Sequence, residues 1–549
     1  MNGEDFKFIK LGGEMKFKFI KPGEIRTRFA PSPTGFLHLG SARTALFNYL
    51  FAKKYQGSFI LRIEDTDVER SKPEFEKDVL ENLRWLGIEW NEGPRTEAGL
   101  SAGQDRYFGD YGPYRQSERK QIYQKYLEKL LNEGKAYYCF CSEEELEAQR
   151  QYQMSIGEAP RYSGKCANLS KEEVKKCLAE GKKSVIRFKV EAKKVEFEDL
   201  IRGKIEFDAS LLGDFVIAKD LVTPLYNFGV VVDDFEMRIS YIIRGEEHIS
   251  NTPKQILIQE ALNISQPKYA HLPLILGPDR SKLSKRHGAV SVALYRKSGY
   301  LAEALINFMA FLGWNPGTER EIYSLASLIK EFSIERIQKG GAVFNIKRLD
   351  FLNGFYIRQK SIERLTELII PYWIKAGLIK GRGNPEPEPL KLPLEEKAQF
   401  IIKETGEEIS LEILKKIVSL YQERLKKLSE IVELTDFFFK EKFEYKKELL
   451  KWKDMGDKEI RQSLDKLLKM LYKIKEGEFT KENLEKILLP ESEKFTREIK
   501  KPMEDRGYFL WPLRVALTGK ETSAGPFEIA EILGRERVLK RIEEAKRKL

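Results

Sequence analysis

The chain has 549 residues, of which 42% are hydrophobic, and its 96 Lys and Arg residues outnumber its 85 Asp and Glu residues to give a net charge of +11. A chain of this length exceeds one hydrophobic core and predicts three to five domains of roughly 100 to 200 residues each. No apolar run reaches the roughly 18 residues that a membrane-spanning helix needs, and four cysteines are too few for a disulfide framework. These features exclude a membrane partner and favour a cytoplasmic protein.

The excess of basic residues suits a polyanionic partner such as nucleic acid, although a charged, solvated surface explains it equally well. Residues 1–23 lack the apolar core of a signal peptide, and their acidic residues argue against a transit peptide. We expect an N-terminal extension there, to which the sequence assigns no function.

The segment after this extension alternates between predicted strands and helices. A strand is expected over 24–30 (EIRTRFA), a helix from about Leu39 to Tyr55, a strand over 58–65 (SFILRIED) and a helix over 72–87 (KPEFEKDVLENLRWLG). This order predicts a parallel sheet with helices on its faces. Ligands of such sheets bind at the carboxyl ends of the strands.

The next segment predicts a helix over 117–135, with Ser117 as its N-cap and Gly134 beyond its end. Alternating apolar and polar residues over 184–190 and 195–208 predict strands of a separate module inserted into the sheet domain. The pattern then returns to buried-strand character over 226–234 (YNFGVVVDD) and 237–245 (MRISYIIRG).

After about residue 290 the pattern becomes helical and remains so. Apolar residues from Leu411 to Leu428 keep three-and-four spacing, which predicts one amphipathic helix of several turns. The proline-rich stretch 381–393 predicts an exposed, extended loop. A change from aromatic to charged composition near 440–455 suggests a domain boundary.

His38, one of only four histidines, lies directly before the helix that begins at Leu39. The N-terminus of a helix favours an anion, and Gly40 would let a flat ring approach the backbone. These features fit a nucleotide site that has no Walker loop, since no G-x-x-x-x-G-K-[ST] is present. A plain helix cap is the alternative, and for an isolated H-x-G it is the favoured one.

A second candidate segment, LGPDRSKLSKRHGAV, covers residues 276–290 and carries Lys282, Lys285 and Arg286 around Ser284. Nucleotidyl transfer needs positive charge where negative charge builds up on phosphorus. A basic loop by itself is more often a solvated surface loop than a phosphate-binding one. The two segments together, with a sheet domain between them, point to nucleotide chemistry.

HLGS resembles the HIGH signature, and KLSKR the KMSKS signature, of class I aminoacyl-tRNA synthetases. Together with LRIEDTD, GPYRQSER and YIIRGEEHISNTPKQ, they make the chain resemble bacterial-type glutamyl-tRNA synthetases from about residue 24 to the end. The resemblance implies a monomeric ligase that uses ATP, Mg²⁺, L-glutamate and tRNA(Glu). Whether tRNA(Gln) is also charged stays open, and a non-catalytic, synthetase-like RNA-binding protein is the alternative.

The implied fold is an α/β Rossmann-type catalytic domain with an inserted α+β acceptor-binding module, followed by all-α anticodon-binding domains. The implied boundaries are 24–115 and 221–280 for the two halves of the catalytic domain, 116–220 for the inserted acceptor-end module, 281–360 for the KMSKS-type loop and stem-contact domain, and 361–445 and 446–549 for the two helical anticodon-binding domains, after the extension 1–23.

The resemblance also implies roles for single residues. For ATP and catalysis they are His38, Lys282 and Lys285, with Gly40 as a further ATP contact. For glutamate they are Arg28 and Arg244 on the carboxylate side, Glu64 at the amino group, and Ser32 and Tyr226 as further contacts. Arg424 aligns with an arginine that relatives use to read the anticodon, although a solvated arginine is an equal alternative. We expect Asp65 and Asp67 to cap a helix or hold a loop, and His248, His271 and His287 to make structural hydrogen bonds.

Cys139, Cys141 and Cys166 lie within the predicted module. Three thiolates and a fourth donor would make a closed structural zinc site, and some bacterial-type members resemble this spacing and bind zinc there. At the position where some of these family members have a histidine, this chain has Asn168. Tyr162 or a water molecule would therefore have to be the fourth zinc ligand. Zinc and three buried free thiols are equally compatible with the pattern.

Overall fold

The computed structural model describes residues 24–67, 69–95, 106–284, 291–382, 399–502 and 504–549. The described chain folds as two compact units, one of residues up to 296 with 302–349, the other of residues 297–301 with 350–549. None of the helices in these ranges is long and apolar enough to cross a membrane.

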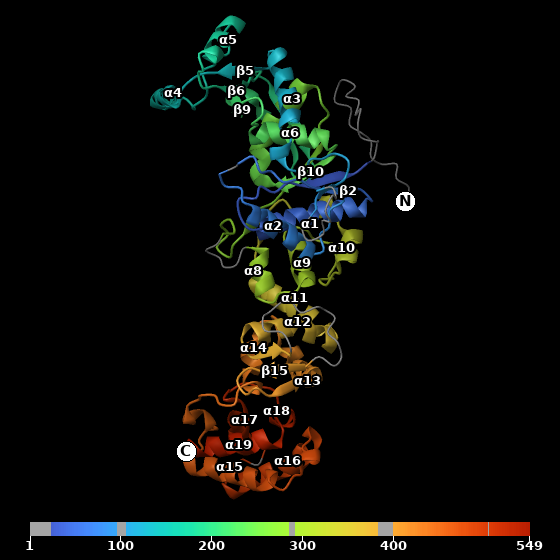
Figure 1. Cartoon of the computed structure of the whole chain (residues 1–549), viewed down its shortest axis with the longest axis vertical. Helices are drawn as coiled ribbons and strands as arrows, with labels where there is room; N and C mark the ends of the chain where they lie inside the picture. The colour runs from blue at the N-terminus through green and yellow to red at the C-terminus, as the bar shows by residue number, and fades with distance from the viewer. Residues whose placement is uncertain (1–23, 68, 96–105, 285–290, 383–398, 503) are drawn as a thin grey trace. The chain divides into compact units, whose positions relative to one another are not determined.

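A six-stranded sheet forms the centre of the first unit (Figure 1), with the order β2-β1-β10-β11-β7-β8. Its strands are β1 (Arg26–Phe29), β2 (Ser58–Leu61), β7 (Lys194–Asp199), β8 (Gly203–Asp208), β10 (Tyr241–Gly245) and β11 (Lys268–Leu272). All neighbours pair in parallel except β7 and β8, which form an antiparallel hairpin. The predicted parallel sheet is therefore confirmed.

Five of the longer helices follow strands of this unit. They are α1 (Leu39–Lys54), α2 (Pro73–Trp85), α3 (Lys120–Asn132), α6 (Tyr226–Glu236) and α7 (Thr252–Leu262). Among them, α1 and α7 contact the main sheet directly. Helix α1 is buried on nearly all sides, from Leu39 to Ala52, because it packs on the sheet and on further helices of the unit. The predicted limits of this helix are confirmed to within one residue.

Two local predictions in this region are wrong. Residues 226–234 form most of helix α6, not a strand. Seven consecutive residues from Phe228 to Asp234 are buried, and a continuously buried segment shows no hydrophobic period that would distinguish a helix from a strand. Ser117 does not cap α3 either. Its hydroxyl donates to Asp65 Oδ2 over 2.6 Å, and the helix begins at Lys120.

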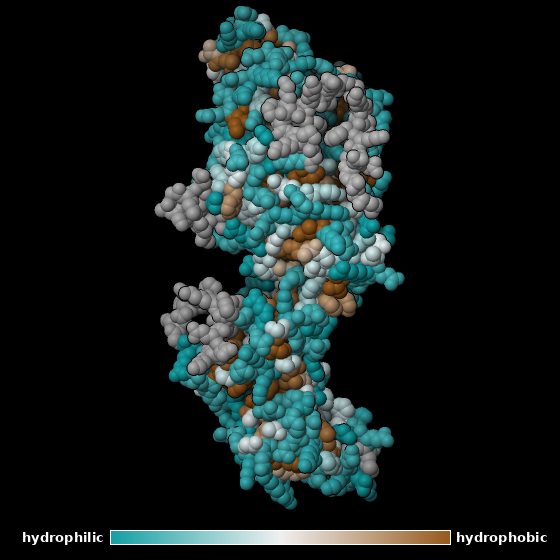
Figure 2. All heavy atoms as spheres, turned by 90° about the vertical axis from the view of Figure 1, so that its right-hand side faces the viewer, coloured by the Kyte–Doolittle hydropathy of each residue, from teal (hydrophilic) through white to brown (hydrophobic). Residues whose placement is uncertain are grey.

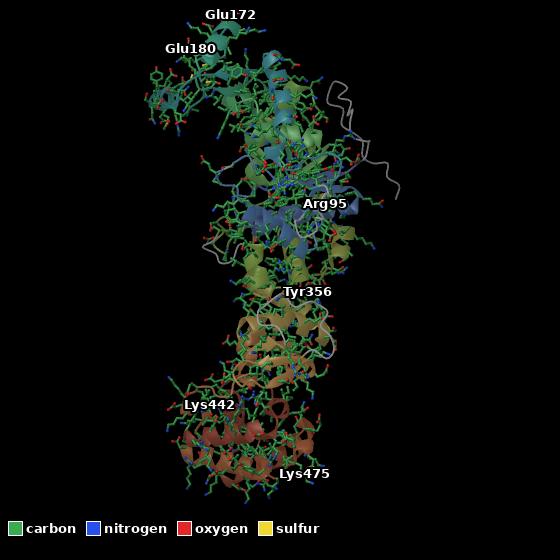
Figure 3. The ribbon with its side chains drawn as sticks, in the orientation of Figure 1. Arg95, Glu172, Glu180, Tyr356, Lys442 and Lys475 are labelled. Carbon is green, nitrogen blue, oxygen red and sulfur yellow. The ribbon has the colours of Figure 1, made fainter. Side chains whose placement is uncertain are left out.

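A smaller antiparallel sheet, in the order β5-β6-β9, stands apart from the main one. It comprises β5 (Ala136–Cys139), β6 (Val185–Phe188) and β9 (Phe215–Ala218), with α4 (Glu143–Ser155) and α5 (Lys171–Ala179) beside it in Figure 1. Figure 3 shows Glu172 and Glu180 projecting from the segment of α5. The hairpin of β7 and β8, in contrast, joins the main sheet through β11, a pairing that local alternation of residues does not reveal.

The rest of the first unit consists of short elements. They are β3 (Gly93–Pro94), β4 (Tyr107–Phe108), β12 (Ile275–Leu276), β13 (Ala342–Val343), α8 (Val292–Lys297), α9 (Ala302–Ala310) and α10 (Leu325–Glu331), and α11 (Ile346–Arg358) runs on into the second unit. Strands β12 and β13 pair in parallel on the two sides of the basic loop in the sequence.

The second unit is largely helical, as predicted. Its helices are α12 (Ile362–Lys375), α13 (Leu411–Tyr421), α14 (Glu430–Thr435), α15 (Asp457–Leu471), α16 (Lys481–Glu498), α17 (Gly507–Thr518), α18 (Pro526–Leu533) and α19 (Arg535–Arg547). Its outer face is mostly hydrophilic in Figure 2, and exposed lysines such as Lys442 and Lys475 project from it in Figure 3.

Two features of this unit differ from the prediction. A three-stranded antiparallel sheet, β14 (Ile379–Gly381), β15 (Gln399–Ile402) and β16 (Glu408–Ser410), interrupts the helices. The amphipathic helix ends at Tyr421, seven residues before Leu428, although Leu425 and Leu428 are buried like the helical residues before them. The proline-rich residues 383–393 lie outside the described ranges.

Candidate active site

The two candidate segments meet at the start of helix α1. His38 caps this helix, since its Nδ1 accepts a hydrogen bond of 3.1 Å from the N–H of Gly40. His38 also pairs with Ser291 in an antiparallel bridge, and Val292 N–H donates to the carbonyl of Leu37 over 2.9 Å. Ser291, the first described residue after the basic loop, therefore lies beside His38.

Lys282, which lies in the first part of the same loop, is exposed and influences His38 electrostatically. Burial, and after it the charge of Lys282, hold the pKa of His38 below its usual range. The imidazole is therefore neutral at physiological pH, and because Nδ1 accepts from Gly40, its proton is on Nε2. Lys285 lies outside the described residues, as does His287.

Gly40 has space around its Cα that the protein itself does not fill. A Cβ at this position would lie 3.5 Å from His38 Nδ1 and 4.0 Å from Ile275 Cδ1, which are ordinary van der Waals contacts. Its φ does not lie in the left-handed region. Packing and backbone conformation therefore give no reason for a glycine here, whereas a ligand lying against the backbone would.

A network of buried charges lies near the carboxyl ends of β1 and β2. Arg28 Nε donates to Asp234 Oδ1 over 3.1 Å, and Arg62 donates to the same oxygen over 2.7 Å. Arg62 also donates to Glu64 Oε1 over 2.9 Å. Burial raises the pKa of Glu64, an effect that Arg62 offsets only in part.

Positive and negative charges in this network are equal in number. Three arginines and three carboxylates pair here among the described residues: Arg28, Arg62 and Arg119 with Glu64, Asp233 and Asp234. Sequence reasoning missed Arg62 and Asp234. Arg62 could have been found, because a residue two positions before Glu64 on a strand points to the same face.

Arg244, on β10, differs from these arginines because its partners are uncharged. Its Nε donates to His271 Nε2 over 3.2 Å, and its Nη2 donates to Thr252 Oγ1 over 2.9 Å and to Gln255 Oε1 over 2.8 Å. The buried Nη1 has no partner within the described part of the chain. Arg244 thus carries a positive charge that none of its hydrogen-bond partners neutralises, and its buried Nη1 is available to an anionic ligand.

Tyr226 begins helix α6, and its hydroxyl lies 3.0 Å from His248 Nδ1. Burial, followed by the charge of Arg244, lowers the pKa of His248 to about 3, so this imidazole is neutral.

Ser32 is exposed in the loop after β1. Asp65 accepts bonds from Ser117, and Asp67 accepts from Arg70, which confirms that these carboxylates hold loops.

In the second unit, Arg424 is exposed just after helix α13, and its Nη1 donates to the carbonyl of Ser523 over 2.7 Å. Arg514 donates to the same carbonyl over 2.9 Å. Burial, and then the charge of Arg424, lower the pKa of Arg514. Two cations therefore share one carbonyl oxygen on this surface.

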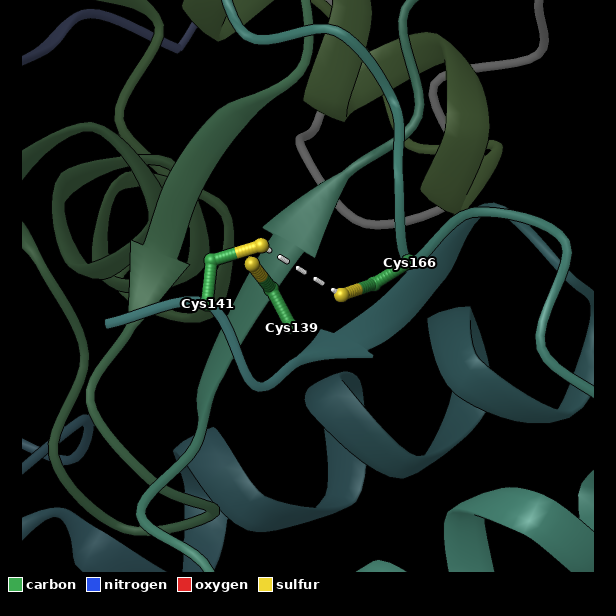
Figure 4. Close-up of side chains that lie close together, drawn as sticks. All are labelled: Cys139, Cys141 and Cys166. Carbon is green, nitrogen blue, oxygen red and sulfur yellow. Dashed lines mark hydrogen bonds between the residues drawn. The ribbon is translucent and has the colours of Figure 1, made fainter. Parts of the chain in front are cut away.

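The structure brings Cys139, Cys141 and Cys166 together, with their sulfurs within 4.8 Å of one another (Figure 4). The sulfurs of Cys141 and Cys166 are 3.6 Å apart, and the Tyr162 hydroxyl lies 3.3 Å from Cys139 Sγ and 3.5 Å from Cys141 Sγ. Asn168 is exposed, and Cys177 contacts Lys182 instead. Three sulfurs, a donor type that zinc accepts, thus converge with one phenol oxygen.

The thiols of Cys139 and Cys141 differ in how readily they ionise. Burial opposes ionisation, but hydrogen bonds with Tyr162 and Arg187 hold the pKa of Cys139 below its ordinary value. Burial and the neighbouring thiols raise the pKa of Cys141 to about 11. A metal ion would remove this mutual penalty, because each thiolate would then face a positive charge.

Two family models match the chain. Residues 24–351 match the catalytic domain of class I tRNA synthetases (E and Q), and residues 364–546 match an anticodon-binding domain. The chain is 48% identical to glutamate–tRNA ligase 1 of Caldicellulosiruptor saccharolyticus, over 95% of this chain and 98% of that protein. It is 45% identical to the glutamate–tRNA ligase of Carboxydothermus hydrogenoformans, over 93% and 97% of the two chains.

Solved structures show the same relationship. A glutamate tRNA ligase from Elizabethkingia meningosepticum, crystallised in complex with its amino acid, aligns with a TM-score of 0.78 and 32% identity. The alignment covers 95% of this chain and 99% of that one.

Proposed function

The chain belongs to the glutamyl-tRNA synthetase family of class I tRNA synthetases, and from this membership we propose which of its residues perform each step of the reaction. Its activity is that of a glutamate–tRNA ligase. The enzyme activates L-glutamate with ATP, releasing pyrophosphate, and transfers the glutamyl group to the 3′ end of tRNA. This reaction implies ATP with Mg²⁺, glutamate and tRNA as its reactants.

For glutamate, we propose that the unpaired Nη1 of Arg244 binds the side-chain carboxylate and that Glu64 receives the ammonium group. The ammonium would bring a positive charge to a carboxylate whose burial otherwise disfavours ionisation. Arg28, Ser32 and Tyr226 are assigned as further contacts. The observation that carries this assignment is the uncompensated charge of Arg244: glutamate has a net charge of −1, and glutamine has none.

For ATP, we propose that His38 Nε2 donates to a phosphate oxygen while Gly40 lets the nucleotide lie against the backbone. Lys282 and Lys285 would then supply positive charge as the glutamate carboxylate attacks the α-phosphorus and pyrophosphate leaves. The bridge between Ser291 and His38 supports these roles, because Ser291 directly follows the basic segment and lies beside the start of helix α1.

If Gly40 faces the nucleotide, its replacement should weaken the binding of ATP without lowering the stability of the fold. Gly40→Ala is expected to leave the melting temperature unchanged or higher, since alanine stabilises a helix by up to about 1 kcal/mol relative to glycine. The KM for ATP is expected to rise about tenfold, because an intruding methyl group costs roughly 1–3 kcal/mol in a filled site. Aminoacylation at varied ATP concentration measures this.

Gly456→Ala is the control, because this glycine also stands at the start of a helix, α15, and a Cβ added to it would meet no other atom within 4 Å. Its KM for ATP should not change. An equal KM for both variants would show that Gly40 does not face the nucleotide.

For tRNA, we propose that Arg424 contacts the anticodon, which the neighbouring charge of Arg514 supports. The domain limits remain proposals too. They are 24–115 with 221–280 for catalysis, 116–220 for the acceptor end, 281–360 for the KMSKS-type loop and stem contact, and 361–445 and 446–549 for the anticodon. We also retain a monomer in the cytoplasm as a proposal, which rests on family membership.

We propose a structural zinc ion held by the thiolates of Cys139, Cys141 and Cys166, a donor type that fits the ion, with Tyr162 as the fourth donor. When bound, it would join β5 to the segment around Cys166 and so stabilise the module beside the main sheet. The ion would take no part in the transfer of glutamate.

Metal analysis of the purified protein is expected to find about one zinc ion per chain. Cys166→Ser should reduce the zinc content several-fold and lower the melting temperature, because structural zinc contributes directly to folding free energy. Cys177→Ser is the matched control and should keep both values. A protein without zinc, or equal behaviour of the two variants, would leave three buried thiols as the correct description.

The test of the proposed function is glutamate-dependent aminoacylation of purified tRNA(Glu) and tRNA(Gln) in parallel, with ATP and Mg²⁺. Charging of tRNA(Glu) alone would establish a discriminating enzyme, and charging of both would establish a non-discriminating one. Binding of both tRNAs without charging would overturn the proposal in favour of an RNA-binding protein.

A further inference from the structure

We infer that Asp199 and His271 are positioning residues, which hold the guanidinium of Arg244 in place for the side-chain carboxylate of glutamate. This inference rests on the proposed role of Arg244 as a glutamate ligand. It extends that role to two residues outside the signature motifs.

The three residues come from three neighbouring strands of the main sheet. Arg244 on β10 and His271 on β11 are direct partners in the parallel register. Asp199, on β7, is the register partner of Tyr269, which lies two residues before His271. Since side chains alternate along a strand, all of them point to the same face of the sheet.

The hydrogen bonds determine the proton positions of this relay. Arg244 can only donate, so His271 Nε2, 3.2 Å from Arg244 Nε, must be the acceptor. The ring proton is then on Nδ1 and is donated to Asp199 Oδ2, 2.7 Å away. Burial keeps the pKa of His271 below its ordinary value, although Asp199 raises it, and this agrees with a neutral ring.

The arrangement orients Arg244 without neutralising it. His271, Thr252 and Gln255 accept from Nε and Nη2 as uncharged groups, so the positive charge and Nη1 both remain for a ligand. A carboxylate in direct contact with Arg244 would instead compete with the carboxylate of glutamate. Asp199 acts from the far side of the imidazole and selects its tautomer.

Asp199 is surrounded by donors only, which makes an amide at this position informative. Its Oδ1 accepts from the N–H groups of Ile201 and Arg202 over 3.0 and 2.8 Å, and its Oδ2 accepts from the N–H of His271 over 3.1 Å as well as from its ring. Either orientation of an asparagine would place an NH₂ group against a donor. If that NH₂ group faced the imidazole of His271, the ring would have to accept at Nδ1 and carry its proton on Nε2. The N–H at Nε2 would then face the N–H of Arg244, and their hydrogen bond would be lost.

The experiment is steady-state aminoacylation by the full-length enzyme at varied glutamate, with tRNA(Glu) and ATP saturating. Asp199→Asn is expected to raise the KM for glutamate about tenfold, the scale of a lost hydrogen bond to a charged group, with the KM for ATP unchanged. His271→Leu should raise it similarly. His271→Gln should restore part of the affinity, because its amide oxygen can accept from Arg244. Asp214→Asn is the control: this carboxylate accepts from Tyr137 of the small sheet and from the N–H of Val190, and its loss should leave the glutamate KM unchanged.

The double variant tests whether Asp199 acts through His271. In a His271→Leu background, Asp199→Asn should add nothing to the glutamate KM, since coupled residues are not additive. Full additivity, or a lower melting temperature with an unchanged KM, would overturn the relay and leave the pair a purely structural role. If Arg244→Gln itself left the glutamate KM unchanged, the proposed pocket would be wrong, which is a separate outcome.

Discussion

Arg244→Gln is expected to reduce kcat/KM for glutamate by a factor on the order of 10² to 10³. Removing one partner of a buried, hydrogen-bonded charge pair costs roughly 2–5 kcal/mol, and each 1.4 kcal/mol corresponds to a factor of ten. Much of this cost arises because the carboxylate of glutamate would enter the pocket without a counter-charge. Glutamine, which has no such carboxylate, should lose far less, so the preference for glutamate over glutamine should fall.

The stability of the variant separates this role from a structural one. Arg244 is a buried cation that no carboxylate compensates among the described residues, so its replacement should not lower the melting temperature. Arg26→Gln is the matched control, because Arg26 is equally buried in the same sheet but forms an ion pair with Glu92 over 2.7 Å. That variant should lose stability and keep its KM for glutamate. The reverse pattern would contradict the assignment.

Lys285→Ala is expected to lower the rate of tRNA- and glutamate-dependent ATP–pyrophosphate exchange by a factor on the order of 10² to 10³. Removing one group that stabilises the charge of a transition state typically lowers the rate by a factor of about 10² to 10³. Lys285 itself lies outside the described residues. The prediction rests on the KLSKR segment and on the position of Lys282 and Ser291 near His38 at the two ends of the loop.

The affinity for tRNA, measured by filter binding, should remain within about twofold for Lys285→Ala, because one phosphate contact among many adds little. Arg280→Ala is the control, since Arg280 is an exposed cation that lies just before the KLSKR segment. It should keep the exchange rate. If Lys285→Ala weakened tRNA binding as much as it slowed exchange, the loop would be an RNA contact only.

Local patterns in the sequence were sufficient for several features. The order of strand and helix predicted the parallel sheet, because the apolar periods of 2 and 3.6 residues are properties of short segments. The helix after His38 and the meeting of three cysteines with Tyr162 were also expected, and the structure has both. A single position can serve two purposes, as His38 shows: it caps a helix and lies beside the basic loop.

Other features depended on contacts between distant segments. Helix α6 has the composition of a buried strand, yet the segment is helical, because tertiary context can override the strand preference of such residues. The hairpin of β7 and β8 joined the main sheet because Asp199 pairs beside Tyr269, seventy residues further along the chain. The small sheet β14-β15-β16 likewise interrupts a region whose residue pattern is helical.

The sequence by itself determined the family resemblance, the candidate residues and the order of the elements, since these depend on motifs and on neighbours along the chain. Only the tertiary structure decided which arginines are neutralised. Arg28 and Arg244 are the same residue type in the sequence. In the structure, however, Arg28 donates to the carboxylate of Asp234, while Arg244 donates to the neutral ring of His271. The charge of a buried group depends on what the fold places within a few ångströms of it, and strand register, not sequence distance, sets that neighbourhood.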